Sequence, residues 1–258
     1  MGNKWYSALH IGVIASIVVG GSATGLLIPA SSAYATQSVA KQKQTEAVKV
    51  TTKHVSSKTP DLHLDMKIPI VSGLKDKKYE AQLNDILLRN AMKSKEVMEK
   101  EAEEYAADAK ENGWPLTPYE LLADYKVKQT GSILSLAISQ YEFTGGAHGN
   151  SDTTYYNIVN KPNTKSVQLA DLFKPGVGYK SIINKEISKQ IQAKKNEADW
   201  YTFTSISDAQ SFSLEKGKII IHFGSYEIAP YAAGQPEFAI PVAKLKNSLK
   251  PEFFALLK

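Results

Sequence analysis

The spacing of the apolar residues changes along this chain, and that change restricts the possible folds more than any other feature. Within 48–70, apolar residues alternate with polar ones, which is typical of strands with one buried face. Within 76–111 they recur every three or four residues, which predicts a long amphipathic helix with a break near Ser94. Strands and helices do not alternate regularly afterwards. The pattern therefore excludes a doubly wound sheet and predicts an α+β fold.

The second half of the chain continues this mixture. Further elements are expected as strands at 119–129, 132–143 and 153–159, a helix at 179–191, a hairpin at 212–223 and a short strand at 238–240. We predict two packed lobes, each a mainly antiparallel sheet covered by an amphipathic helix. Their expected bounds are 47–160 for the first α+β domain and 161–258 for the second.

The N-terminal residues have the layout of a secretory signal peptide. Lys4 precedes an apolar stretch from Ala8 to Ile28, and the small residues of Ala33-Tyr34-Ala35 form a cleavage site. We predict a signal peptide at 1–35 and a polar linker at 36–46. The alternative is a retained membrane anchor, because about 20 apolar residues are enough to span a bilayer. The protein would then contact the membrane only through this uncleaved segment, as a single-pass protein with an extracellular domain.

Composition removes several classes of function. The chain contains no Cys, which excludes disulfides, thiolate metal sites and a cysteine nucleophile. Its 31 Lys and Arg residues against 26 Asp and Glu give a net charge of +5, but Arg89 is the single arginine. Bidentate contacts to bases and phosphates favour the planar guanidinium of Arg over the ammonium of Lys. We therefore expect no nucleic-acid partner.

No complete catalytic motif is present. The chain has no G-x-S-x-G, and no H-x-x-x-H pair that would place two imidazoles on one helix face. His222 lies within an apolar strand and is expected on the solvent face or in a hydrogen bond. We predict no catalytic residues, no metal and no cofactor. The rival hypothesis is a hydrolase in which Glu142, His148 and Glu227 converge.

Two stretches are candidates for a ligand site. Tyr141–Asn150 places three glycines around a histidine at the end of a strand, which suits either a tight loop or a ligand-binding loop. Tyr226–Gly234 combines two tyrosines with Pro and Gly, which suits either a stacking platform for sugar rings or a locked irregular loop. The candidate ligand-binding residues are Gly145, Gly146, His148, Gly149, Tyr226, Glu227 and Tyr231.

In this order, the two stretches resemble the extracellular module shared by PdaC-type peptidoglycan deacetylases and RsiV-type anti-sigma factors. The matching residues are Phe143–Gly149, Tyr226–Gly234 and Phe238–Pro241, within a resemblance over Val48–Lys246. It implies a two-part α+β module whose second part is a domain of uncharacterised role. In the deacetylases the module precedes a metal-dependent catalytic domain. In RsiV-type proteins it binds lysozyme and thereby triggers release of a sigma factor.

Neither complete activity is expected here. The sequence lacks an H-x-x-x-H pair and ends at Lys258 soon after the module, which argues against deacetylation. About seven residues precede the apolar stretch, too few to hold a sigma factor. We expect an exported, non-enzymatic binding module, secreted or wall-associated, whose ligand is wall glycan (peptidoglycan) or a lysozyme-like enzyme. The alternatives are a membrane-anchored RsiV-like sensor and a hydrolase or deacetylase-related enzyme acting on wall polysaccharide.

The second half of the 76–111 helix is rich in Glu and Asp. Such a charged outer face is usually just solvated. It is also an alternative surface for a basic partner such as lysozyme.

Overall fold

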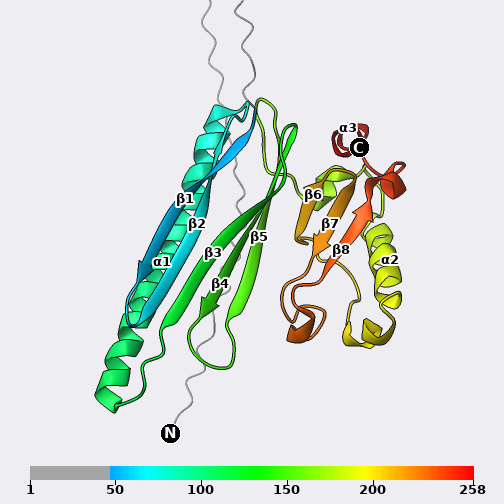
Figure 1. The fold of residues 1–258 in the computed structure, drawn as a ribbon. Helices are drawn as coiled ribbons and strands as arrows, with labels where there is room; N and C mark the ends of the chain where they lie inside the picture. The colour runs from blue at the N-terminus through cyan, green and yellow to red at the C-terminus, as the bar shows by residue number, and fades with distance from the viewer. Residues whose placement is uncertain (1–46) are drawn as a thin grey trace, which may run out of the picture. The chain divides into compact units, whose positions relative to one another are not determined.

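Figure 1 shows the computed structural model, which describes residues 47–258. The predicted signal peptide at 1–35 and linker at 36–46 lie outside the described residues. In the part that is described, the strands form a five-stranded sheet in the order β1-β2-β3-β4-β5 and a three-stranded sheet in the order β6-β7-β8. Within the same part of the chain, no helix has the length and apolarity required to cross a membrane.

The first sheet contains one parallel pair of strands. Its elements are β1 (Lys49–Lys58), β2 (Leu62–Ser72), α1 (Lys77–Asn112), β3 (Tyr119–Gln129), β4 (Ile133–Phe143) and β5 (Asn150–Val159). Because α1 connects β2 to β3, these two strands run parallel, while every other neighbouring pair is antiparallel. The sheet is therefore mainly antiparallel, as predicted.

Helix α1 begins and ends at residues suited to capping. The Asp76 carboxylate accepts a hydrogen bond of 3.0 Å from the backbone N–H of Tyr79, and Gly113 ends the helix in the left-handed conformation at φ 68°. The predicted break near Ser94 is wrong, because α1 is continuous over 36 residues. Its apolar face continues on both sides of Ser94, where Ala91 and Met98 pack in one cluster.

The two faces of the first sheet differ sharply. On β2, Leu64 and Met66 are almost completely buried and pack in the cluster that includes Met98 of α1. The residues between them, such as Asp65 and Lys67, point to the opposite side because side chains alternate along a strand. We call this opposite side the open face.

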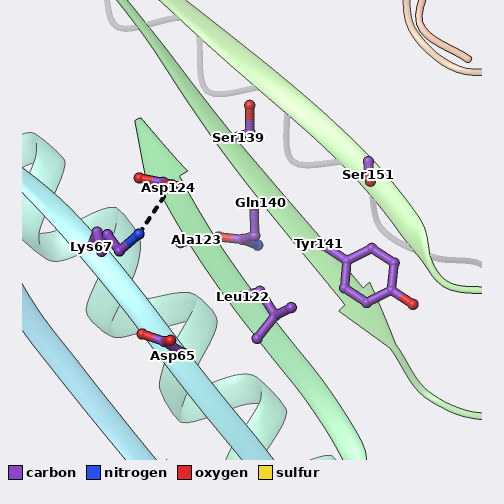
Figure 2. A pocket seen from close by; sticks show the side chains of 9 residues that line it. All are labelled: Asp65, Lys67, Leu122, Ala123, Asp124, Ser139, Gln140, Tyr141 and Ser151. Carbon is purple, nitrogen blue, oxygen red and sulfur yellow. Dashed lines mark hydrogen bonds and ion pairs between the residues drawn. The ribbon is translucent and has the colours of Figure 1, made fainter. Parts of the chain in front are cut away.

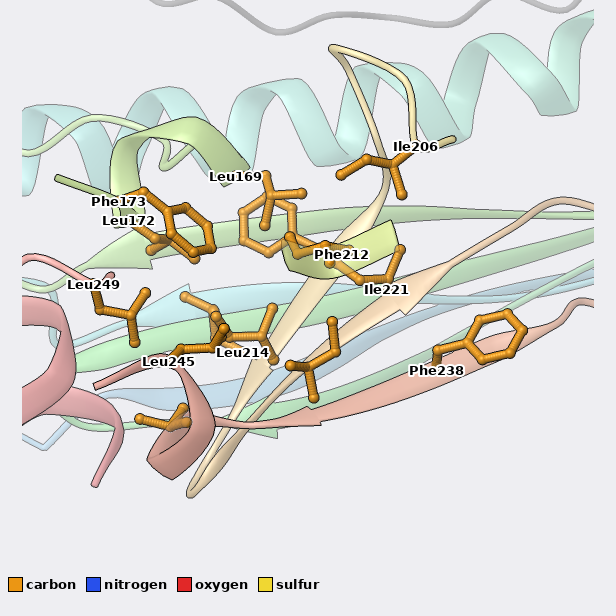
Figure 3. Packing of buried hydrophobic residues seen from close by; sticks show 14 of the residues in the cluster. Leu169, Leu172, Phe173, Ile206, Phe212, Leu214, Ile221, Phe238, Leu245 and Leu249 are labelled. Carbon is orange, nitrogen blue, oxygen red and sulfur yellow. The ribbon is translucent and has the colours of Figure 1, made fainter. Parts of the chain in front are cut away.

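The rest of the chain builds a second hydrophobic core, shown in Figure 3. Its elements are η1 (Leu169–Leu172), α2 (Tyr179–Gln192), η2 (Lys195–Trp200), β6 (Phe212–Glu215), β7 (Lys218–His222), η3 (Tyr231–Ala233), β8 (Glu237–Pro241), η4 (Val242–Leu245) and α3 (Pro251–Leu257). Ile133 of β4 is buried in this cluster and Val159 of β5 packs against it. The second core therefore includes residues of the first sheet. The predicted α+β class is confirmed.

Candidate binding site

The two candidate stretches meet although they are far apart in sequence. The first forms the loop between β4 and β5, and the second forms the loop between β7 and β8 (Figure 1). The His148 ring stacks on the Tyr231 ring with centroids 4.1 Å apart and an interplanar angle of 18°. The Tyr226 ring lies against Tyr231 at 5.5 Å and 31°. We call these three residues the aromatic patch.

Gly149 holds the patch together through its carbonyl oxygen. That oxygen accepts a hydrogen bond from Nδ1 of His148 at 3.0 Å and another from the Tyr231 hydroxyl at 3.2 Å. Gly149 is also the one glycine of this loop with no room for a side chain. A Cβ there would lie 2.5 Å from both the Glu142 carbonyl oxygen and the Tyr141 ring. The sequence prediction of a tightly packed glycine loop therefore describes Gly149 well.

Gly145 and Gly146 serve the loop differently. Their φ angles are 95° and 91°, in the region that favours glycine, and a Cβ at either position would meet nothing within 4 Å. They allow the chain to turn, whereas Gly149 allows it to pack.

Tyr226 is the most unusual residue of the patch. It has a φ of 65°, which costs a non-glycine residue about 1–3 kcal/mol, and 60% of its surface is exposed. Its neighbour Glu227 caps the same turn, because its carboxylate accepts a 2.7 Å hydrogen bond from the Gly224 N–H. A bulky aromatic side chain is thus presented to solvent on a strained turn that the protein holds in place.

A second pair of contacts fixes the β7–β8 loop to β5. The Gln235 amide donates to the Ser151 carbonyl oxygen at 2.9 Å, and the Thr153 hydroxyl donates to the Gln235 side-chain oxygen at 3.1 Å. Nothing in the sequence singles out Gln235, because this contact depends on the final positions of a loop and a strand that are distant in sequence.

The three residues of the rival hydrolase hypothesis form hydrogen bonds with residues close to them in sequence. Glu142 accepts from the Gln140 amide at 2.6 Å, Glu227 caps Gly224, and His148 donates to the carbonyl oxygen of Gly149. In residues 47–258, no hydrogen bond or ion pair joins any two of Glu142, His148 and Glu227. Each of the three groups therefore has its recorded hydrogen bond within its own segment.

The other histidines also have local partners. His54 pairs with Asp65 across β1 and β2, and His63 lies 3.8 Å from Glu120. Across the described residues, no three His, Asp or Glu side chains gather as a metal site would require.

Of the two positions predicted for His222, a hydrogen-bonded one and one on the solvent face, the first is confirmed and the second is wrong. Its ring is 5% exposed, stacks on Tyr155 at 4.0 Å, and shares a 2.8 Å hydrogen bond with Ser213. Burial lowers the pKa of His222 to about 4, and Lys128 acts in the same direction. Glu237 lies 3.5 Å from Nδ1, but its carboxylate is well solvated, so burial dominates and the ring is neutral.

A buried polar junction between the two sheets was not predictable from the sequence. The Ser135 hydroxyl donates to the Asn157 side-chain oxygen at 2.7 Å and accepts from the Leu214 N–H at 3.1 Å. The Asn157 amide donates to the Phe212 carbonyl oxygen at 2.8 Å. We call Ser135, Asn157, Phe212 and Leu214 the buried junction. A Ser and an Asn at alternating positions of predicted strands gave no warning of this role.

The fold and the patch define the class of this chain, a two-part α+β module, and comparison with known proteins agrees. The family described as "Deacetylase PdaC" matches residues 55–151, and the family of unknown function DUF3298 matches residues 170–243. Two solved DUF3298 proteins share the fold. The one from Bacteroides fragilis has a TM-score of 0.65 at 23% identity, covering 84% of this chain and 99% of that one. The one from Pseudomonas aeruginosa has a TM-score of 0.55 at 21% identity, covering 80% and 95%.

One curated protein is similar to this chain over most of its length. The chain is 28% identical over 200 residues to the anti-sigma-V factor RsiV of Bacillus subtilis strain 168. The match covers 73% of this chain and 66% of the relative, just under two thirds of its length. The predicted resemblance to the module shared by PdaC-type and RsiV-type proteins is therefore confirmed.

Proposed function

We propose that this chain is an exported, non-enzymatic binding module whose aromatic patch binds a basic wall-cleaving enzyme of the lysozyme type. Residues 1–35 act as the signal peptide, 36–46 as a linker, and 47–160 and 161–258 as the two domains. The protein is then secreted or wall-associated.

The charge around the patch is the observation that carries this proposal. The two segments that build it, 129–160 and 219–243, contain four carboxylates and no Lys or Arg, in a chain with 31 basic residues. The four are Glu142, Asp152, Glu227 and Glu237, and all are exposed. Acidic segments that present aromatic side chains suit a basic protein, because opposite charges steer association and tyrosines supply contact energy.

Affinity for lysozyme tests the proposal directly. We expect measurable binding by titration calorimetry that weakens as salt is added, because exposed charges are screened. Replacing Tyr226 with Ala removes the exposed ring and is expected to weaken binding at least tenfold, as for a central interface tyrosine. Trp200→Ala is the matched control, since Trp200 is 45% exposed outside the patch. Equal affinity of the wild type and Tyr226→Ala would contradict the proposal.

The exposed Tyr226 ring also suits stacking against a sugar, so wall glycan is the second candidate ligand. Sedimentation of the protein with insoluble peptidoglycan, with and without lysozyme, separates the two. Retention only when lysozyme is present supports the enzyme as ligand. Retention without lysozyme that is lost in Tyr226→Ala supports glycan.

The membrane-anchored alternative is tested at the N-terminus. Mass spectrometry of the exported protein is expected to find Thr36 as the first residue. An intact segment 1–35 in the membrane fraction would instead support an anchored sensor.

A further inference from the structure

The open face of the first sheet contains a cavity of about 300 Å³, whose lining side chains are shown in Figure 2. Four successive strands contribute to it, with Asp65 and Lys67 from β2, Asp124 from β3, Tyr141 from β4 and Ser151 from β5. Of the labelled residues of β4, Tyr141 lies nearest the end of the strand (Figure 2). These residues come from the strands of a sheet, so the cavity has a rigid base.

The lining combines an apolar surface with polar groups. Leu122 and the Tyr141 ring are directly opposite each other on β3 and β4 and provide apolar contact area. Carboxylates and hydroxyls lie around them, from Asp65, Asp124, Ser139 and Ser151. Small-molecule sites typically have this composition, with apolar walls and a few polar groups that fix the orientation of the ligand.

The charged groups in the cavity are partly paired. Lys67 lies 3.3 Å from the Asp124 carboxylate, and Asp65 pairs with His54. The hydrogen bond from His54 lowers the pKa of Asp65, so this group stays ionised at neutral pH. Two carboxylates and one ammonium group line the cavity, so it does not favour an anionic ligand. The carboxylates still have lone pairs that accept hydrogen bonds from hydroxyl groups.

The cavity and the aromatic patch are linked through Gly149 and the β7–β8 loop. The Tyr141 ring packs against Gly149, whose carbonyl oxygen binds both His148 and Tyr231. Ser151 lines the cavity while its carbonyl oxygen accepts from Gln235 of the β7–β8 loop. A ligand in the cavity therefore lies next to the surface proposed above for protein binding.

We propose that this cavity is a saccharide-binding site that accepts a pyranose ring of a neutral glycan. The apolar face of the sugar packs on Leu122 and Tyr141, and its hydroxyls donate to Asp65 and Asp124. The site is separate from the aromatic patch, and it does not depend on lysozyme binding.

Titration of the full chain with the N-acetylglucosamine tetrasaccharide, followed by NMR, tests the site. We expect shifts of backbone amides at 65–67, 122–124, 139–141 and 151. The double variant Asp65→Asn, Asp124→Asn is expected to bind at least tenfold more weakly, which is about 1.4 kcal/mol. Ser151→Trp fills the cavity from an exposed position and is expected to abolish the shifts. Asp85→Asn on α1 is the matched control and keeps wild-type affinity.

Several results of this titration would overturn the saccharide site. Shifts confined to 144–149 and 224–234, or no shifts at millimolar sugar, would overturn it. Binding of a free wall stem peptide in the cavity, without binding of the tetrasaccharide, would also overturn it. Lysozyme affinity measured on the same variants keeps the two proposals apart. Loss of sugar binding with lysozyme binding unchanged supports a separate site, whereas absence of lysozyme binding by the wild type affects only the proposed function.

Discussion

The buried junction and the aromatic patch both join the first sheet to the C-terminal part of the chain, but they do so in opposite ways. Ser135 and Asn157 are 0% and 3% exposed, and their side chains exchange hydrogen bonds with each other and with β6. His148 and Tyr226 are exposed, and Tyr226 occupies a strained conformation.

This difference indicates that the two regions have different roles, one in stability and the other in binding. Buried polar groups that satisfy one another stabilise one arrangement and leave nothing for a ligand to bind. Exposed aromatic rings on a strained turn add little stability but keep a large contact surface available. The buried junction is therefore expected to stabilise the fold and the aromatic patch to bind the ligand, and variants of each region test this division.

The His222 region is expected to give the largest effect, and it depends on pH. The folded-state pKa of about 4 lies below the ordinary value of 6.5, so the unfolded chain binds the proton more readily. The contribution of His222 to the free energy of unfolding is fully present above pH 6.5. It falls by about 3 kcal/mol as the pH drops to 4. Urea unfolding at both pH values measures this loss. His222→Gln is expected to reduce it, and an unchanged loss in that variant would contradict the assignment.

Asn157→Ala is expected to break the buried junction itself. It leaves the Ser135 hydroxyl and the Phe212 carbonyl oxygen without their partner, which costs about 3 kcal/mol. Thr154→Ala, at an exposed position of the same strand, is the control and should change stability by less than about 0.5 kcal/mol. Lysozyme affinity of the folded Asn157→Ala protein should match the wild type, and a large loss would blur the distinction between the two regions.

Gly149→Ala tests the residue that links packing to the patch. The added methyl meets backbone and ring atoms at 2.5 Å, so we expect about 2 kcal/mol of destabilisation together with weaker binding. Gly131→Ala has positive φ but open space, so it should cost about 1 kcal/mol from strain and leave affinity unchanged. Equal effects of both variants on affinity would show that the Gly149 contacts do not position the patch.

Tyr226→Gly is expected to have the smallest effect on stability. Glycine adopts a φ of 65° without strain, and the lost side chain is mostly exposed, so unfolding should change by less than about 1 kcal/mol. Binding should nevertheless fall at least tenfold, because the aromatic ring is gone. A variant that loses much stability and keeps its affinity would reverse the roles assigned to the two regions.

Sequence periodicity predicted the elements well because they depend on local patterns. Strand β3 and helix α2 begin at the predicted residues. The predicted break at Ser94 failed because a polar residue within a long helix is tolerated when apolar residues continue the buried face on both sides.

The contacts between distant segments were less predictable. The glycine loop and the tyrosine loop were each recognised, but their stacking through His148 and Tyr231 depends on tertiary structure. The buried junction and the cavity on the open face were missed for the same reason. A Ser or an Asp on a strand has the same local pattern whether it faces solvent, a partner strand or a ligand.

Hydrogen exchange of the full chain with and without lysozyme tests the central claim most directly. The account predicts slower exchange in residues 143–150 and 224–235, with helix α1 unchanged. Protection confined to the acidic second half of α1, with both loops unaffected, would contradict it.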